Sequence, residues 1–415
     1  MNYTPSISMH KTFVCLAAGL ALLGPLEAQQ GQAAPPAYDQ AGYYPTSLLA
    51  PDVPLSGDQF KVRSKGYDDG LVATYWVDAN DGTTYRAVGK GQLYQRIAEI
   101  YAIAKLREMD SGQQFGDAAG NTAKNTVTAV GDTLSDPGKF IKGIPQGASK
   151  FFGSIGEGLK GGHSEYEGKA YSNVLGQSKA KRMLAVQLGV SPYSTNETLQ
   201  KELNRVGWSK AGGALTINLA VSAIPAGAGL GLNMNRNLQT QIAEKDPNQL
   251  NIMNRKKLLS LGVSHETADL LLQHEWYSPV HRTVITEALA SLGPDHGQDI
   301  FLKTAARAGS EVDANYFQEM AQLIEKYNQS ENPVQTLLRS GNTVSFIDSK
   351  GTWVFPVPFD YALWTATVHE RATRAFAARK PGEPLLFYTT GRLSEAAKAA
   401  CERDGAHIQE GVSLQ

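Results

Sequence analysis

Glycine is concentrated in the middle of the chain, which limits what that region can fold into. The 120 residues from Gly112 to Gly231 hold 21 of the 41 glycines. A glycine inside a helix costs about 1 kcal/mol relative to alanine, so helices in this region are weak on their own. We therefore expect the region to need a partner surface, either its own protein or a lipid.

The chain of 415 residues is too long for one ordinary domain, and 42% hydrophobic residues are enough for real cores. The changes in periodicity predict an α+β fold that is mainly helical. The expected parts are a signal peptide (1–28), a Pro/Gly/Gln-rich linker (29–56), a β-meander plus helix (57–110), a Gly-rich amphipathic helical region (111–245), a helical domain (246–330) and a small α/β lobe (331–415).

The N-terminus has the pattern of an export signal. His10 and Lys11 precede the run TFVCLAAGLALLGPL, which is too short for a stable membrane anchor. Small residues allow cleavage near Ala28 or Ala33. The mature chain would then keep only Cys401 and form no internal disulfide. We predict a periplasmic or secreted protein.

Strand patterns dominate the part before the glycine-rich region. The last two of three strand-like runs are joined by Asn80-Asp81-Gly82, a strong hairpin turn. A helix with apolar residues at Leu93 and Ile97 follows. The runs are FKVRS (60–64), LVATYWVDA (71–79) and TTYRAVG (83–89).

Helical periodicity dominates residues 246–328. The tetrapeptide LGVS occurs at 188–191 and again at 261–264, each time after a basic helical stretch, with Gly suited to end one helix and Ser to start the next. Either a duplicated helix–turn–helix unit or capping chemistry alone accounts for the two copies.

The last part alternates strands and helices. A hairpin from TVSFID and TWVFPVP precedes a long helix over 359–379, a strand over 385–390, a helix over 394–405 and a last strand over 406–412. Strand–helix–strand order predicts parallel pairing through a right-handed crossover.

Two polar and aromatic clusters in this lobe are the candidate ligand-binding residues. The second cluster, over 388–392, follows the predicted parallel strand, and open α/β sheets bind ligands at that end of their strands. The alternative is that these residues only make the turn and that Ser394 caps the next helix. The candidates are Asp360, Tyr361 and Trp364, and then Tyr388, Thr390, Gly391 and Arg392.

Motifs for catalysis or metal binding are weak. The histidines lack the H-E-x-x-H spacing, and the Ser178–Lys181 pattern stands in the wrong order for a penicillin-binding enzyme. Cys401 with His407 could pair a nucleophile with its base, but the small residues around Cys401 favour a buried structural thiol. We predict no catalytic residue, no metal and no cofactor.

The segment 137–162 is the strongest candidate for contact with a membrane surface. Its apolar residues form one stripe over five helical turns, and lysines border the stripe, as in helices that lie in the lipid interface. The alternative is packing against the protein's own core. The residues concerned are Phe140, Ile141, Ile144, Phe151, Phe152, Ile155 and Leu159, with Lys139, Lys142 and Lys150.

Three blocks resemble an uncharacterised group of exported proteobacterial proteins. They are LGVSPYSTNETLQKEL (188–203), FPVPFDYALWT (355–365) and YTTGRLSEAAKA (388–399). The resemblance implies export, but no activity is assigned to that group and no catalytic residue carries over.

The leading hypothesis is an exported, non-enzymatic structural or interaction protein of the cell envelope that contacts an anionic membrane surface or another envelope protein. The alternative is a periplasmic hydrolase or ligand-binding protein with its site in the α/β lobe. A pore-former that inserts the uncharged run Gly213–Leu232 is a weaker third hypothesis. A net charge of −1 gives no field that would attract nucleic acid.

Overall fold

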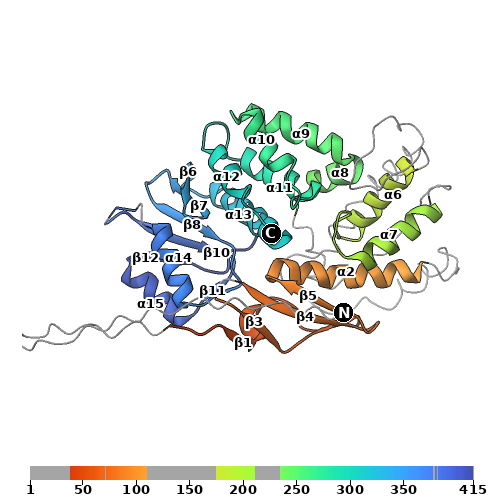
Figure 1. The fold of residues 1–415 in the computed structure, drawn as a ribbon, viewed down its shortest axis with the longest axis horizontal. Coiled ribbons are helices and arrows are strands. Elements are labelled where there is room, and N and C mark those ends of the chain that lie inside the picture. The colour runs from red at the N-terminus through yellow and green to blue at the C-terminus, as the bar shows by residue number, and fades with distance from the viewer. Residues whose placement is uncertain are drawn as a thin grey trace, which may run out of the picture. The chain divides into compact units, whose positions relative to one another are not determined.

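Two five-stranded sheets and the helices packed on them make a mixed α+β fold that is mainly helical, as predicted (Figure 1). The computed structural model describes residues 38–70, 72–109, 174–210, 234–376, 379–380 and 382–414. These all belong to one compact unit, Tyr38–Gln415. Three predicted features lie outside the described residues: the signal peptide, the stripe over 137–162 and the uncharged run Gly213–Leu232.

The first sheet is antiparallel. Its order is β1-β3-β4-β2, and β5 pairs with β4. The β4–β5 hairpin turns at Gly82, whose φ of +84° suits glycine. The strands are β1 (Gly42–Pro45), β2 (Phe60–Val62), β3 (Lys65–Asp68), β4 (Ala73–Ala79) and β5 (Thr84–Val88).

Part of the predicted linker belongs to this sheet. Strand β1 and the short helix α1 (Thr46–Leu49) lie within 29–56, and Leu49 is completely buried. Thr46 fixes the segment because its hydroxyl donates to Arg63 O at 2.6 Å. The Pro- and Gly-rich composition gives no sign of strand β1, because β1 forms by pairing with β3 and not from local propensity.

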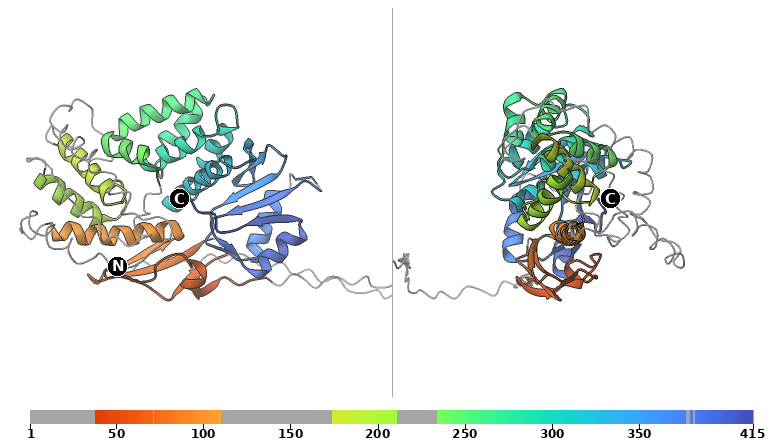
Figure 2. Two further views of the ribbon diagram at one scale, coloured as in Figure 1. Left: turned by 180° about the vertical axis from the view of Figure 1, so that it is seen from behind. Right: turned by 90° about the vertical axis from the view of Figure 1, so that its right-hand side faces the viewer.

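Helix α2 (Lys90–Glu108) covers one face of this sheet. Leu93, Ile97 and Tyr101 pack into the core of the sheet, and the opposite side of α2 packs on α6 (Val174–Gln187) and α7 (Glu197–Lys210). Figure 2 shows α2 between the sheet and these two helices in both views.

Six helices follow, and five of them begin with a side-chain cap, the exception being α12 after Gly297. Ser264 accepts a hydrogen bond from Thr267 N, and Asp246 and Ser278 form capping boxes. The helices are α8 (Arg236–Glu244), α9 (Pro247–Ser260), α10 (His265–Leu272), α11 (Pro279–Ala290), α12 (Gln298–Ala305) and α13 (Glu311–Asn328).

Both LGVS copies end a helix in the same way. Gly189 and Gly262 have φ of +70° and +85°, and Val190 N and Val263 N donate back to carbonyls five residues earlier. Only the second serine starts a helix directly, because α7 begins after Asn196. Capping chemistry is thus sufficient to explain the shared letters.

The second sheet has the order β12-β10-β8-β7-β6. Strands β8, β10 and β12 are parallel, as predicted, and β6 and β7 are antiparallel. Helices α14 (Ala366–Phe376) and α15 (Glu395–Arg403) cover one face. The strands are β6 (Val334–Ser340), β7 (Thr343–Asp348), β8 (Trp353–Val357), β10 (Leu385–Thr389) and β12 (Ala406–Gln409).

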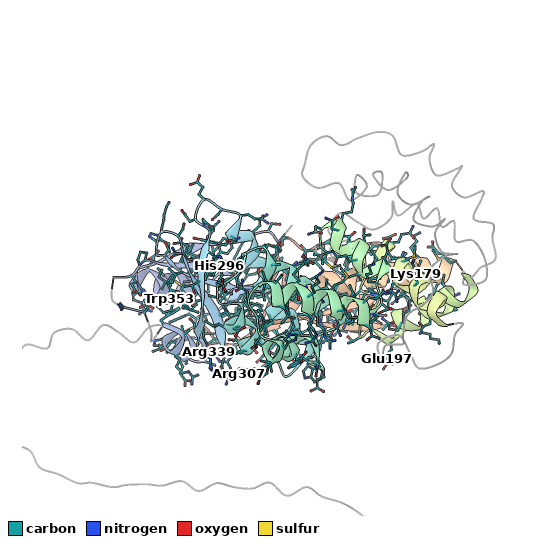
Figure 3. The ribbon with its side chains drawn as sticks, turned by 90° about the horizontal axis from the view of Figure 1, so that it is seen from above. Lys179, Glu197, His296, Arg307, Arg339 and Trp353 are labelled. Carbon is teal, nitrogen blue, oxygen red and sulfur yellow. The ribbon has the colours of Figure 1, made fainter. Side chains whose placement is uncertain are left out.

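The other face of this sheet shares one core with the preceding helices. Phe346 and Val354 of the sheet pack in the same cluster as Phe301 and Phe317 of α12 and α13. The predicted division at residue 330 therefore separates segments of sequence and not separate cores. In Figure 3, Arg339 and Trp353 of this sheet lie at one end of the described residues, and Lys179 of α6 and Glu197 of α7 lie at the other.

The prediction of one long helix over 359–379 is wrong for its first part. Tyr361–Ala362 forms β9, which pairs in parallel with β11 (Arg392–Leu393), and α14 begins only at Ala366. Thr365 ends the extended stretch because its hydroxyl accepts a hydrogen bond from Val368 N at 3.2 Å. Among the described residues, no helix is both long and apolar enough to cross a bilayer.

Candidate functional site

The first sheet has a second face, here called the outer face, which no described helix covers (Figures 1 and 2). Side chains alternate along β4, and Ala73, Tyr75 and Val77 are buried toward α2. Trp76 and Asp78 therefore lie on the outer face. The register adds their cross-strand partners to the same face: Tyr43 opposite Tyr67, Tyr67 opposite Thr74, Trp76 opposite Arg86 and Lys61 opposite Asp78.

Three aromatic rings gather on the outer face. Tyr43 is 64% exposed and Tyr67 is 37% exposed, and Trp76 is partly exposed. The centroid of the Tyr43 ring lies 5.3 Å from that of Tyr67, edge-on, and 6.3 Å from that of Trp76, stacked. Contiguous exposed apolar surface of this kind marks interaction sites.

The same face is positively charged. Lys61, Lys65, Arg63 and Arg86 are all exposed there. Arg63 forms an ion pair with Asp78 at 3.0 Å, whereas Lys65 and Arg86 form none with a described residue. A local excess of cations on a chain of net charge −1 favours an anionic partner.

The predicted loop over 388–394 is packed against its surroundings. Gly391 lies so close to the chain at 359–360 that an added Cβ would be 2.1 Å from Phe359 O. Thr390 is 9% exposed and its hydroxyl donates to the same carbonyl at 3.1 Å. Arg392 is exposed on β11 and its N–H donates to Asp360 O. The loop joins two segments and leaves little room for a ligand.

The other candidate ligand-binding residues lie in different parts of the fold. Tyr388 packs edge-on against Tyr327 in the core shared with the helices. Tyr361 is partly buried beside the first sheet. Trp364 is 8% exposed on the α14 and α15 side and packs against His369. Asp360, Thr390 and Gly391 meet at the loop, and Arg392 pairs with Tyr361 between β9 and β11.

Asp360 lies at the centre of a buried polar junction between the two sheets. Its carboxylate accepts hydrogen bonds from Tyr75 Oη and from Lys90 N, both at 2.8 Å. Lys90 Nζ lies 3.2 Å from Asp52 and donates to Thr390 O at 3.3 Å. The junction therefore fixes α2 and the first sheet to the C-terminal lobe.

Two more carboxyl groups lie near this junction. Burial raises the pKa of Asp360 to about 6 and that of Asp68 to about 7. Burial, followed by the charge of Asp360, raises the pKa of Glu319 on α13 to about 8. These groups hold protons more tightly in the folded protein than in the unfolded chain. Within the described ranges, no three His, Cys, Asp or Glu side chains are grouped to hold a metal ion.

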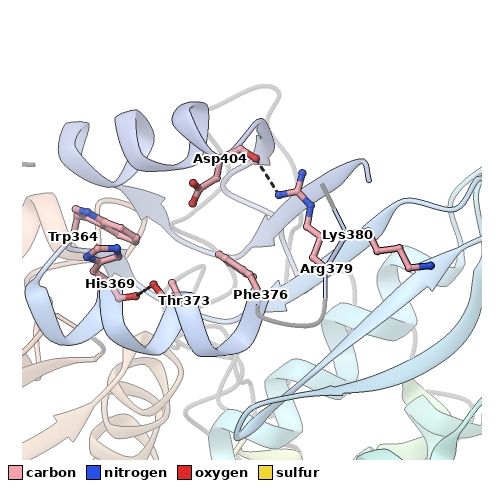
Figure 4. Close-up of a pocket in the computed structure, with 8 residues that line it drawn as sticks. Trp364, His369, Thr373, Phe376, Arg379, Lys380 and Asp404 are labelled. Atoms are coloured by element: carbon pink, nitrogen blue, oxygen red, sulfur yellow. Dashed lines mark hydrogen bonds between the residues drawn. The ribbon is translucent and has the colours of Figure 1, made fainter. Parts of the chain in front are cut away.

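A cavity of about 300 Å³ lies beside Trp364, between α14 and the end of α15 (Figure 4). The Arg379 guanidinium at one end donates to the carbonyls of Asp404 and Glu383. At the other end, His369 Nδ1 and Tyr38 Oη are hydrogen-bonded at 2.7 Å. These polar groups are occupied by the protein itself, so the cavity offers few of them to a ligand.

Cys401 packs inside the C-terminal lobe. It is 6% exposed among Ala397 and Ala400, and burial raises its pKa to about 12. His407 is exposed. The arrangement agrees with a structural thiol, because the thiolate is the reactive form.

We expect Cys401 in the folded mature chain to react with a thiol reagent at least about 100-fold more slowly than in the unfolded chain, because both access and ionisation are suppressed. Timed alkylation followed by peptide mass spectrometry measures the rate. Equal rates with and without denaturant would contradict the buried position.

Comparisons with known proteins give no relative. No protein-family model, no curated protein and no solved structure matches the chain.

The outer face is the feature that sequence reasoning missed. Its signal was present in the alternation of β4 and β3, where Tyr67 and Trp76 occupy positions that face away from the core residues. Tyr43 carried no signal of its own, because its strand was interpreted as linker.

Proposed function

We propose that the protein is an exported, non-enzymatic envelope protein that attaches peripherally to an anionic membrane surface through its outer face. The observation that carries the proposal is the exposed ring cluster of Tyr43, Tyr67 and Trp76, bordered by Lys65 and Arg86, which form no ion pair with a described residue. Tyrosine and tryptophan favour the interface between lipid and water, since one end of each ring is apolar and the other polar.

Charge supports a lipid surface over a second copy of the chain. Two outer faces would bring Lys65 and Arg86 of one copy against the same cations of the other, which is unfavourable. Each Lys or Arg near an anionic bilayer contributes about 1 kcal/mol instead. The rings and the cations also lie on the same side of the sheet, so both can meet one bilayer surface.

The stripe over 137–162 remains a second predicted contact with the same surface. The hydrolase or ligand-binding alternative in the α/β lobe gains no support from the loop over 388–394, because Thr390 and Gly391 are packed against the chain at Phe359.

Flotation with vesicles tests the proposal. We expect the mature chain, beginning at Gln29, to float with phosphatidylglycerol-containing vesicles and not with pure phosphatidylcholine. Arg86→Glu should weaken binding about 30-fold, because it replaces an attraction of about 1 kcal/mol with a repulsion of similar size. Tyr43→Ala with Trp76→Ala should weaken it further.

The controls change the same residue types elsewhere. Arg371→Glu alters an exposed arginine on α14, and Trp276→Ala removes an indole that is 41% exposed before α11. Both should bind as the unmutated chain does. If the outer-face variants keep full binding while Phe151→Asp with Phe152→Asp abolishes it, the contact belongs to 137–162 and the outer-face proposal is wrong.

A further inference from the structure

A second cavity, of about 230 Å³, is lined mainly by α2, the loop between α6 and α7, the residues just before α11, α11 itself and α13. One wall is the loop between α6 and α7, which belongs to the block LGVSPYSTNETLQKEL. The opposite wall is formed by α11 and α13, and Gln95 of α2 contributes from a third side. Segments far apart in the sequence thus supply the side chains of one enclosed space.

The loop is held rigidly behind this wall. Glu99 of α2 is completely buried and accepts hydrogen bonds from Ser194 Oγ at 2.5 Å and Asn196 Nδ2 at 2.9 Å. Arg96 forms an ion pair with the same carboxylate at 2.6 Å. Thr195 Oγ1 donates to Glu311 of α13 at 2.9 Å, which ties the loop to the opposite wall. A binding site gains from such fixed geometry, since little order has to be created when a ligand enters.

Hydrogen bonding fixes the orientation of one amide in the opposite wall. His281 Nδ1 accepts from Ser278 N at 3.1 Å, so the ring proton is on Nε2, which donates to Asn315 Oδ1 at 2.8 Å. Burial lowers the pKa of His281 to about 4, which keeps the ring neutral at physiological pH. Asn315 is therefore held with its oxygen toward His281.

Two buried amide atoms in this wall have no hydrogen-bond partner among the described residues. They are Asn315 Nδ2, a donor, and Gln318 Oε1, an acceptor, one helical turn apart on α13. Buried polar groups without partners are rare and costly in folded proteins. A ligand that offers an acceptor and a donor side by side would satisfy both after small rotations of the amides.

The charge of the lining residues and the exposed Trp276 indicate which class of ligand the cavity can bind. The lining includes Glu275 and Glu311 but neither lysine nor arginine from the described residues, so an anionic ligand is disfavoured. Trp276 also lines the cavity and is 41% exposed. Indole faces pack well against the C–H face of a sugar ring, while amide and carboxylate groups exchange hydrogen bonds with its hydroxyls.

We infer that this cavity binds a single neutral sugar unit, with neighbouring hydroxyls on Asn315 and Gln318 and the apolar face of the ring on Trp276. The volume is below the usual range of about 300–1,000 Å³ for small-molecule sites, which limits the site to one unit. This inference is independent of membrane attachment, because the outer face contributes no residue to the cavity.

Calorimetric titration of the mature chain with glucose, galactose, mannose and N-acetylglucosamine tests the inference. At least one sugar should bind with a dissociation constant below about 10 mM. Gln318→Leu should weaken that binding by about tenfold, since a hydroxyl donor loses its acceptor. The same variant should not lower the melting temperature, because the native acceptor has no partner to lose.

Matched variants separate this site from general effects. Trp276→Ala should also weaken sugar binding, whereas Gln273→Leu, an exposed glutamine on the neighbouring helix end, and Tyr43→Ala on the outer face should not. The inference is overturned if none of the four sugars binds to the folded protein, if choline or putrescine binds the cavity in their place, or if Gln318→Leu and Trp276→Ala leave sugar binding unchanged.

Discussion

Replacement of Gly391 by alanine is expected to lower the free energy of unfolding by about 3 kcal/mol or more. The new Cβ would lie 2.1 Å from Phe359 O and 2.2 Å from Asp360 O. Both are backbone atoms, so no side chain can rotate away. Separation of the two segments would also disturb the hydrogen bond from Lys90 N to Asp360.

Urea unfolding followed by circular dichroism measures this loss. Gly42→Ala is the matched control, since a Cβ at Gly42 would meet no atom within 4 Å, and it should change stability by less than about 0.5 kcal/mol. Equal midpoints for the two variants would show that the chain segments at 360 and 391 are not in close contact.

The second large effect is a pH dependence of stability that originates at Asp68. Its side chain is completely buried, with Oδ1 accepting from Gly70 N at 2.7 Å and Oδ2 lacking a partner among the described residues. Burial raises its pKa from 3.8 to about 7, so the folded protein keeps a proton that the unfolded chain releases near pH 4. The stabilisation is complete below pH 4 and is lost as the pH rises through 7.

Asp68→Asn should remove this dependence. Each pH unit between the two pKa values costs the unmutated protein about 1.4 kcal/mol, so its unfolding free energy should fall relative to the variant by about 3 kcal/mol from pH 5 to pH 7. Both proteins keep a residual slope from Asp360 and Glu319, whose pKa values burial also raises. Urea unfolding at pH 5, 6, 7 and 8 gives the comparison.

Glu331→Gln is the control, because Glu331 is exposed between α13 and β6. This variant should follow the unmutated protein at every pH. Parallel stability curves for Asp68→Asn and the unmutated protein would mean that Asp68 does not hold its proton in the folded state.

Local signals in the sequence were sufficient for much of the fold. The turn at Gly82, the caps at Ser264 and Ser394, and the parallel strand at Leu385–Thr389 depend on neighbouring residues, and the structure contains all of them. Strand β1 and the short β9 depend on pairing with strands far away in the chain. These strands are only four and two residues long, and a segment that short carries no pattern that specifies its pairing partner.

The candidate site likewise depends on contacts between residues that are far apart in the chain. Asp360 belongs to a polar and aromatic cluster in the sequence, but its partners Tyr75 and Lys90 are 285 and 270 residues away. The cavity between α2 and α13 could not be predicted from any local pattern either, because segments far apart in the sequence line it. Asn315 Nδ2 and Gln318 Oε1 belong to an ordinary amphipathic helix, and only the folded arrangement shows that neither atom has a partner among the described residues.

The core shared by α12, α13 and the second sheet also bears on how this protein comes apart. Segments with a common interior lose their contacts together, so residues 246–414 should melt in a single transition, with no intermediate that keeps the helices and releases the strands. A protease cut near residue 330 would leave two fragments that each expose half of an interior. Neither fragment would persist alone, and the pair would be expected to reassociate.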